Sequence, residues 1–247
     1  MMRTKLAGPD ALPTGDRLLT DRLDHLDLLR GMAAWLVLGG HLRGLVFQSY
    51  AELAAEQTGP LVKAFYFATG LGAHAVLAFF ALSGFLVGGK ALGDLLSGRF
   101  TWTGYMLRRL TRLWLVIVPL LVVTFVLDRT GLALTGGAGY DGRFYDVFNS
   151  GPKPLHGIDH GMATLLGNVA FLHTIVVPVF GSNGPMWSLT NEFWYYVVFP
   201  LAAWVGLARV SLAARISGAA LLGCLLLVLP IWLWEGGLVW LAGAVAA

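Results

Sequence analysis

Long apolar stretches separated by short polar segments make up most of the chain. A helix needs about 20 consecutive apolar residues to cross the hydrocarbon core of a bilayer. The pattern therefore predicts an all-α, polytopic transmembrane helix bundle with about six spans and the start of a seventh. The spans are expected at residues 26–47, 62–88, 113–127, 163–180, 187–207 and 212–234, and the last apolar run, 236–247, is too short to cross.

The fourth of these runs, 163–180, leaves two alternatives open. It contains Asn168, His173 and Pro178, which are unusual in a simple span. The run either crosses the membrane or enters it and returns, because non-helical backbone is tolerated at membrane depth where it is buried or lines a cavity.

Composition supports the membrane assignment. Hydrophobic residues make up 57% of the chain and charged residues 13%, about half the usual charged fraction of a soluble domain. In such a protein the net charge of +3 does not indicate nucleic-acid binding, because the positions of basic residues instead indicate how the chain is oriented in the membrane. The single cysteine, Cys224, excludes an internal disulfide.

Basic residues gather between the second and third predicted spans. By the positive-inside rule this loop is cytoplasmic, and so is the N-terminus, two spans earlier. We therefore expect a multi-pass protein of the inner (plasma) membrane, with a polar cytoplasmic tail over 1–24 and a transmembrane domain over 25–247. The loop holds one acidic residue, Asp94, and the basic residues Lys90, Arg99, Arg108, Arg109 and Arg112.

The first predicted span carries two charged or titratable residues, Arg30 and His41. Eleven residues at about 100° each end only about 20° beyond three full turns, so both side chains project from one face, about 16 Å apart along the axis. Taken alone, Arg30 is typical of an arginine at the membrane interface that pairs with Asp27. His41 taken alone is typical of a histidine at the outer membrane boundary whose hydrogen bonds are all made. Together they indicate a polar track, because ionisable groups inside membranes are costly and usually functional.

Two further stretches carry polar groups in apolar surroundings. Ser83 precedes Gly84 in "FFALSGFLV", where small residues are also ordinary helix-packing devices. In "YMLRRLTRLWLV", Arg109 and Arg112 lie three residues apart and predict either a lipid-headgroup anchor or a clamp for phosphates.

The fifth predicted span begins with "GPMWSLTNEFWYYVVFP" and contains a carboxylate, Glu192. Its spacing places Ser188, Glu192, Tyr195 and Tyr196 on one helical face. Trp and Tyr residues are common at membrane interfaces. A carboxylate within an apolar span needs a partner, which makes Glu192 a candidate site residue.

These stretches, in this order, resemble the membrane-bound acyltransferase-3 family, which includes bacterial O-acetyltransferases of surface polysaccharides. The resemblance covers most of the chain and implies about ten spans, so we expect the domain to be incomplete at its C-terminus. The stretches that carry it are "LDLLRGMAAWLVLGGH", "FFALSGFL", "RRLTR" and "WSLTNEFWYYVVFP".

The resemblance implies transfer of an acyl group, acetyl above all, from cytoplasmic acyl-CoA to a hydroxyl of an envelope glycan or lipid-linked sugar. Acyl-CoA would be a co-substrate, the other partner would be membrane lipid, and neither a bound cofactor nor a metal is expected. His41 would act as a general base or carry the acyl group transiently. The other expected roles are catalysis for Arg30 and Glu192, contact with CoA for Arg30, Ser83, Arg109 and Arg112, and contact with the acceptor for Trp187 and Tyr196.

Two other functions fit the same residues. A proton-coupled membrane transporter would also use an intramembrane arginine, histidine and glutamate. An inactive truncated relative of the acyltransferases would retain the residues without the activity.

Overall fold

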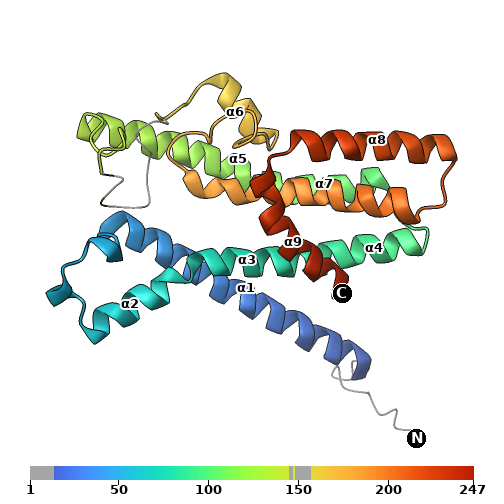
Figure 1. Ribbon diagram of the computed structural model, residues 1–247, viewed down its shortest axis with the longest axis horizontal. Helices are drawn as coiled ribbons and strands as arrows, with labels where there is room; N and C mark the ends of the chain where they lie inside the picture. The colour runs from blue at the N-terminus through green and yellow to red at the C-terminus, as the bar shows by residue number, and fades with distance from the viewer. Residues whose placement is uncertain (1–13, 145–146, 148–156) are drawn as a thin grey trace, which may run out of the picture.

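Helices account for the regular secondary structure in the computed structural model, which describes residues 14–144, 147 and 157–247. Within these residues the one β-type feature is an isolated bridge between His173 and Val177. The prediction of an all-α fold is therefore confirmed. Figure 1 shows the helices up to residue 96 in one tier, the later helices in a second tier, and the last helix, α9, crossing between the two.

The first tier consists of a long helix followed by a nearly continuous helical stretch. Pro60 lies in the first turn of its helix, where its missing N–H leaves no hydrogen bond unmade. A π-helical turn, Gly84–Gly88, follows directly on Ser83, and such turns often accompany functional sites. The helices of this tier are α1 (Thr14–Val46), α2 (Pro60–Gly70), α3 (Gly72–Ser83) and α4 (Gly89–Leu96).

The second tier is built around two long helices, α5 and α7. α5 ends before Gly136, whose φ of 62° is the left-handed conformation that glycine adopts readily after a helix. Ser211 caps α8 by accepting a hydrogen bond from the Ala214 backbone N–H. The second tier and the crossing helix comprise α5 (Trp102–Thr135), α6 (Met162–Val169), α7 (Trp187–Leu207), α8 (Leu212–Val228) and α9 (Ile231–Val245).

Two helical segments of the described chain are long and apolar enough to cross a membrane, residues 60–96 and 102–135. They contain the second and third predicted spans. The predicted span 212–234 is wrong as a single helix, because Pro230 separates α8 from α9 and holds Leu229 in an extended conformation. These last two helices are apolar but shorter than a full span, so the count of six spans stays a prediction.

The run 163–180 does not form a helical span. Only its first residues are helical, in α6, and the chain then turns at Phe171 and Thr174, which both have positive φ. As a consequence, the α7–α8 connection with Arg209 lies at the same end of the molecule as the α4–α5 connection with Arg99 (Figure 1). The shared end agrees with the positive-inside rule.

The basic segment differs from the sequence prediction, and part of the N-terminal tail is helical. α4 continues to Leu96 and α5 begins at Trp102, so the arginines 108, 109 and 112 lie on the first turns of a helix instead of in a loop. Helical periodicity therefore decides where each of them points. Residues 14–24 of the predicted tail belong to α1, and residues 1–13 lie outside the described part of the chain.

α9 packs against α3 and the π-helical turn. A Cβ atom on Gly84 would lie 1.9 Å from the backbone oxygen of Trp240, and one on Gly243 would lie 2.1 Å from that of Ala81. Both positions therefore require glycine for the backbones to approach. The contact brings Trp240 beside Ser83, which is part of the site described below.

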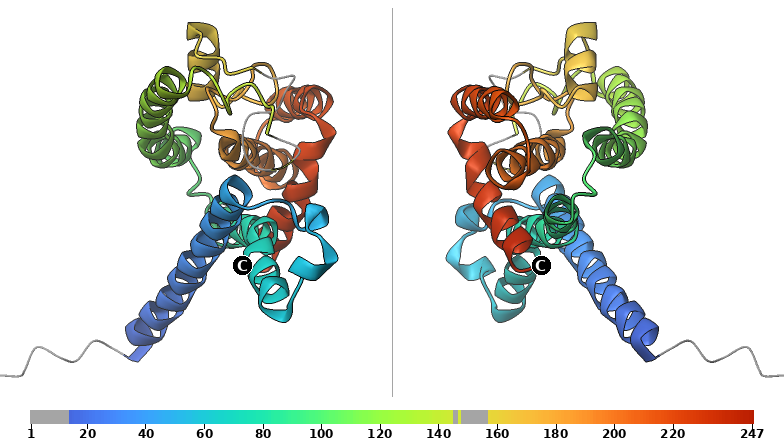
Figure 2. Two further views of the ribbon diagram at one scale, coloured as in Figure 1. Left: turned by 90° about the vertical axis from the view of Figure 1, so that its left-hand side faces the viewer. Right: turned by 90° about the vertical axis from the view of Figure 1, so that its right-hand side faces the viewer.

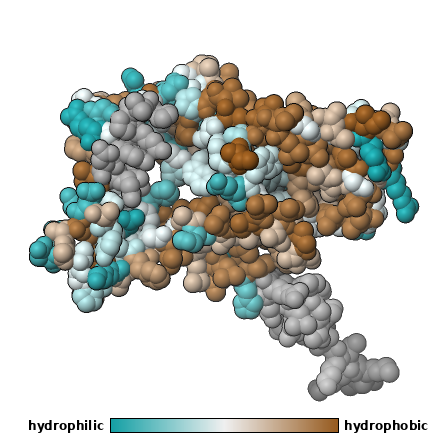
Figure 3. Space-filling model, in the orientation of Figure 1, coloured by the Kyte–Doolittle hydropathy of each residue, from teal (hydrophilic) through white to brown (hydrophobic). Residues whose placement is uncertain are grey.

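Large apolar side chains remain exposed over much of the surface. Trp35 on α1 is 74% exposed and Leu227 on α8 is 89% exposed. α1 packs mainly against α2 and α3 and leans away from the other helices (Figure 2). Hydrophobic residues spread across both tiers in Figure 3, with hydrophilic residues mainly toward the ends. Apolar exposure on this scale fits a chain surrounded by lipid.

Candidate functional site

A cavity of about 230 Å³ opens between the two tiers of helices. α1, α3, α5 and α7 each contribute side chains to it, so each of the four sequence stretches singled out above reaches the same space. The lining residues are Arg30, Val37, Val76, Phe79, Phe80, Ser83, Arg112, Ser188 and Glu192.

Glu192 is the carboxylate of this cavity, and it has the partners that its position in an apolar helix requires. The Ser83 hydroxyl donates a hydrogen bond to Glu192 Oε1 at 2.9 Å, and the Tyr196 hydroxyl donates to the same oxygen. Trp240 Nε1 donates to Ser83 Oγ at 3.3 Å. Trp240 of α9 therefore holds the Ser83 hydroxyl in place, and Ser83 in turn positions one oxygen of the Glu192 carboxylate.

Two guanidinium groups reach the same cavity. Arg30 also pairs with Asp27, at 2.8 Å between Nη1 and Oδ1. Arg112 makes no hydrogen bond or ion pair within the described residues. Because Asp27 already neutralises Arg30, the guanidinium of Arg112 is available to an anionic ligand in the cavity.

Arg109 is not part of this group. It lines a separate small pocket with Tyr105 and Arg108. Its guanidinium carbon lies over the rings of Tyr105 and Tyr196, at 6.0 and 5.9 Å from their centroids. The structure therefore does not join Arg109 and Arg112 in one clamp.

His41 lies on the face of α1 that turns inward, as the spacing from Arg30 predicted. Arg30 and Val37 on this face line the cavity, and His41 follows Val37 by about one turn and is half-buried. α1 touches both neighbouring helices closely here, because a Cβ on Gly40 would lie 3.0 Å from the backbone oxygen of Thr69 in α2 and 3.7 Å from the Cα of Gly72 in α3. His41 is near the cavity but is not one of its lining residues.

The two aromatic residues expected to contact the acceptor, Trp187 and Tyr196, differ in exposure. Trp187 is 38% exposed and packs edge to face on Phe80, with 6.2 Å between ring centroids. Tyr196 is fully buried and its hydroxyl is bonded to Glu192. Its surroundings leave no surface for a ligand, so Tyr196 supports Glu192 instead of contacting an acceptor directly.

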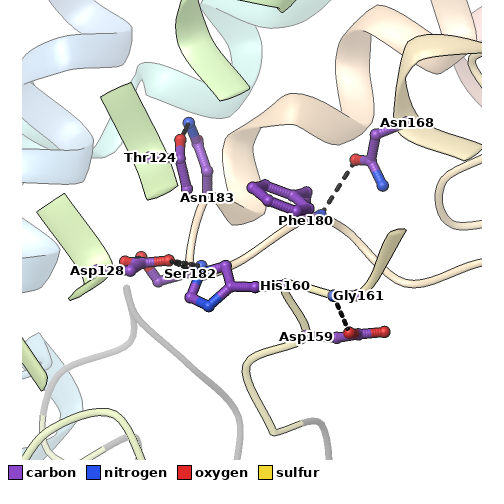
Figure 4. Close-up of polar contacts among 9 residues, drawn as sticks. All are labelled: Thr124, Asp128, Asp159, His160, Gly161, Asn168, Phe180, Ser182 and Asn183. Carbon is purple, nitrogen blue, oxygen red and sulfur yellow. Dashed lines mark hydrogen bonds and ion pairs between the residues drawn. The ribbon is translucent and has the colours of Figure 1, made fainter. Parts of the chain in front are cut away.

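A second polar cluster, which the sequence analysis missed, lies where the loop before α7 meets α5 (Figure 4). Asp128, a buried residue of α5, is its centre. Asp128 Oδ2 accepts hydrogen bonds from the Ser182 backbone N–H at 2.8 Å and from His160 Nε2 at 3.0 Å. Asp128 Oδ1 accepts from the Ser182 hydroxyl at 2.5 Å.

Neighbouring contacts fix the loop around this cluster. Asn183 donates to the Thr124 hydroxyl at 3.0 Å, one turn before Asp128 on α5. Gly181 has a φ of 63°, and a Cβ there would lie 2.2 Å from Asp128 Oδ2, so only glycine fits. The loop is therefore held against α5 by specific contacts.

Asp159 organises the start of α6 beside this cluster. The Thr164 hydroxyl and the Gly161 backbone N–H both donate to its carboxylate. These two hydrogen bonds hold the pKa of Asp159 below its ordinary value.

One sequence signal for the second cluster existed. Asp128 directly follows the apolar run of the third predicted span, and the rule applied to Glu192 would have selected it if that span had been predicted one residue longer. No comparable signal marks His160 or Ser182, because they meet Asp128 only in the folded chain. Among the described residues, no group of three or more His, Cys, Asp or Glu side chains is arranged to hold a metal ion.

The sequence was also compared with known proteins. It matches the family model described as an acyltransferase domain (Acyl_transf_3) over residues 23–247. It is 30% identical over 197 residues to acyltransferase MdmB of Streptomyces mycarofaciens, and this match covers 76% of the chain and 40% of that relative. No solved structure matches. Because the family model covers nearly the whole sequence, the chain belongs to the acyltransferase-3 family.

Proposed function

We propose that this chain takes part in moving an acyl group, acetyl above all, from cytoplasmic acyl-CoA to a hydroxyl of an envelope glycan or a lipid-linked sugar. It would do so as a multi-pass protein of the inner (plasma) membrane, with its N-terminus in the cytoplasm. The single observation that carries the proposal is the shared cavity. Arg30, Ser83, Arg112 and Glu192 come from four separate helices of an acyltransferase-family chain and line one space.

The guanidinium of Arg112, which has no ion-pair partner among the described residues, favours binding of the donor substrate. CoA carries phosphate groups, and a guanidinium binds a phosphate through two parallel hydrogen bonds. Arg112 has no competing partner within the described residues and is the better of the two candidates, since Arg30 already pairs with Asp27. The volume of about 230 Å³ is below the roughly 300–1,000 Å³ of typical small-molecule sites. The cavity would therefore admit only part of an acyl-CoA.

His41 is the proposed base. The acceptor hydroxyl would give its proton to the imidazole while its oxygen attacks the thioester carbonyl. A carbon–oxygen bond forms, the carbon–sulfur bond breaks, and the imidazolium returns the proton to the departing thiolate of CoA. In the alternative, His41 attacks the thioester first, releases CoA and then passes the acyl group to the hydroxyl.

Glu192 and Ser83 would shape the same space. Glu192 Oε1 accepts two hydroxyl hydrogen bonds, whereas Oε2 has no partner within the described residues. The free oxygen could orient an acceptor hydroxyl or the ring of His41. Trp187, partly exposed beside Phe80, offers an aromatic surface to a sugar.

The proposal is tested by expressing the full chain and supplying radiolabelled acetyl-CoA to the membranes. Labelled glycan is then measured for the native chain and for His41→Ala. We expect transfer by the native chain and a loss of at least about 100-fold in the variant, the size of a general-base contribution. His74→Ala, which changes an exposed histidine on α3, is the matched control and should leave transfer unchanged.

Each failure has its own meaning. Full activity in His41→Ala would overturn the role of His41 while leaving the reaction intact. Absence of transfer, together with proton-coupled uptake of a solute, would favour a transporter. Absence of both would identify the chain as inactive by itself.

A further inference from the structure

The Asp128 cluster presents an imidazole nitrogen that the fold does not use. A carboxylate only accepts hydrogen bonds, so we assign the proton of the contact with Asp128 to His160 Nε2. In neutral histidine the other nitrogen, Nδ1, is then a hydrogen-bond acceptor. Figure 4 shows this second ring nitrogen directed away from Asp128. It has no partner within the described residues, and 15% of the side chain is exposed.

The ring is held in place on several sides. Phe125 and Phe180 pack against it edge to face, at 5.4 and 5.2 Å between ring centroids. Asp128, which anchors it, is itself fixed by both hydrogen bonds from Ser182. A histidine that served only to close the loop would not need its free nitrogen to remain accessible.

A second unpaired polar group lies against the same part of α5 that carries Asp128. The Tyr140 hydroxyl lies against α5 one turn beyond Asp128, since a Cβ on Gly131 would be 1.9 Å from it. It makes no hydrogen bond within the described residues. Burial, and then the charge of Asp128, raise the pKa of Tyr140 above its ordinary value, so the hydroxyl stays protonated and can donate.

We propose that His160 and Tyr140 bind a hydroxyl group of a neutral, polyhydroxylated ligand, the sugar acceptor of acyl transfer, at the end of α5 far from Arg112. The imidazole nitrogen accepts from the ligand and the phenol donates to it. Phe125, 44% exposed, provides an apolar surface for the carbon face of a sugar ring. The Asp128 carboxylate disfavours an anionic ligand, and its filled hydrogen-bonding positions disfavour a cation. Naming this ligand the acceptor rests on the proposed function.

The inference is tested by measuring the KM for the glycan acceptor and the KM for acetyl-CoA with the full chain in membranes. In His160→Gln the amide keeps a donor for Asp128 but the ring nitrogen is lost, and Tyr140→Phe removes only a hydroxyl. Each is expected to raise the KM for the glycan acceptor by roughly 3- to 10-fold, the effect of one hydrogen bond, and to leave the KM for acetyl-CoA unchanged. His74→Gln is the matched control. An unchanged acceptor KM in both variants, with melting temperatures equal to that of the native chain, would overturn the inference.

A second measurement separates this inference from the proposed function. The native chain, labelled with isotope-enriched histidine in detergent, is titrated with methyl glucoside as the probe, and His160→Gln identifies the signal by its loss. We expect the probe to shift the Nδ1 resonance of His160, whereas tetrahydropyran, a ring of the same size without hydroxyls, does not. No shift would overturn hydroxyl binding. If the native chain shows no acyl transfer, the proposed function fails and this titration alone decides the inference.

Discussion

Arg112 and Asp128 lie on the same helix, α5, about 24 Å apart at 1.5 Å per residue, and the chain treats their charges in opposite ways. Arg112 enters a cavity without any hydrogen bond or ion pair from the described residues. Asp128 is buried, and both of its oxygens accept hydrogen bonds from His160 or Ser182. At one end of the helix the charge is thus open to a ligand, and at the other end the charge is closed off by its own hydrogen bonds.

The difference shows which of the two residues can bind a ligand and which one positions another side chain. An unpaired cation that lines a cavity is available to an anion at little cost to the fold. A buried carboxylate with three donors is costly to disturb, because each donor would lose its partner. Asp128 therefore acts by holding His160, whereas Arg112 is free to act directly. The predictions below test this contrast, from the largest expected effect to the smallest.

Removing the carboxylate of the closed end should have the largest effect on stability. Asp128→Ala leaves two donors of Ser182 and one of His160 without a partner, so we expect the free energy of unfolding to fall by about 3 kcal/mol. Thermal melting in detergent measures the change. Arg112→Ala is the comparison and should change stability by less than about 0.5 kcal/mol. Equal losses in both variants would contradict the contrast.

The contact of Trp240 with Ser83, next to the cavity that Arg112 lines, should contribute less to stability than the Asp128 carboxylate does. Trp240→Phe keeps an aromatic ring in the contact with the π-helical turn but removes the N–H that donates to Ser83. We expect a loss of about 2 kcal/mol in stability, because the lost hydrogen bond is joined by the cavity that the smaller ring leaves. A loss above about 3 kcal/mol in the same melting experiment would show that packing of the indole, and not its hydrogen bond, holds Ser83.

Local spacing was sufficient to predict much of the open end. Glu192 was selected because a carboxylate in an apolar span needs a partner, and Arg30 because it shares a helical face with His41. Ser83 and Arg112 were assigned site roles by the family resemblance, and the structure brings all four residues to one cavity. The shared face of Arg30 and His41 follows from helix geometry alone. The all-α architecture follows from the long apolar runs.

The remaining features depend on contacts between distant parts of the chain. Tyr196 has the spacing of a ligand contact, yet burial against α9 makes it a support for Glu192. Trp240 belongs to a run that was predicted to be too short to cross the membrane, but its helix, α9, begins earlier, at Ile231, and packs Trp240 beside Ser83. The partners of Asp128 come from the segments on either side of α6, more than 30 residues away in sequence, and no periodicity predicts such contacts.

Direct binding of acetyl-CoA tests the central claim, that the cavity is the donor site. The purified full chain in lipid nanodiscs is titrated with acetyl-CoA by calorimetry, alongside Arg112→Ala and Arg99→Ala. Arg99 is an exposed arginine on the same side of the molecule that lines neither pocket. We predict affinity about 10-fold weaker for Arg112→Ala, the effect of losing a charge-assisted hydrogen bond, and unchanged for Arg99→Ala. Equal affinities for the native chain and Arg112→Ala would contradict the assignment of the donor site to this cavity.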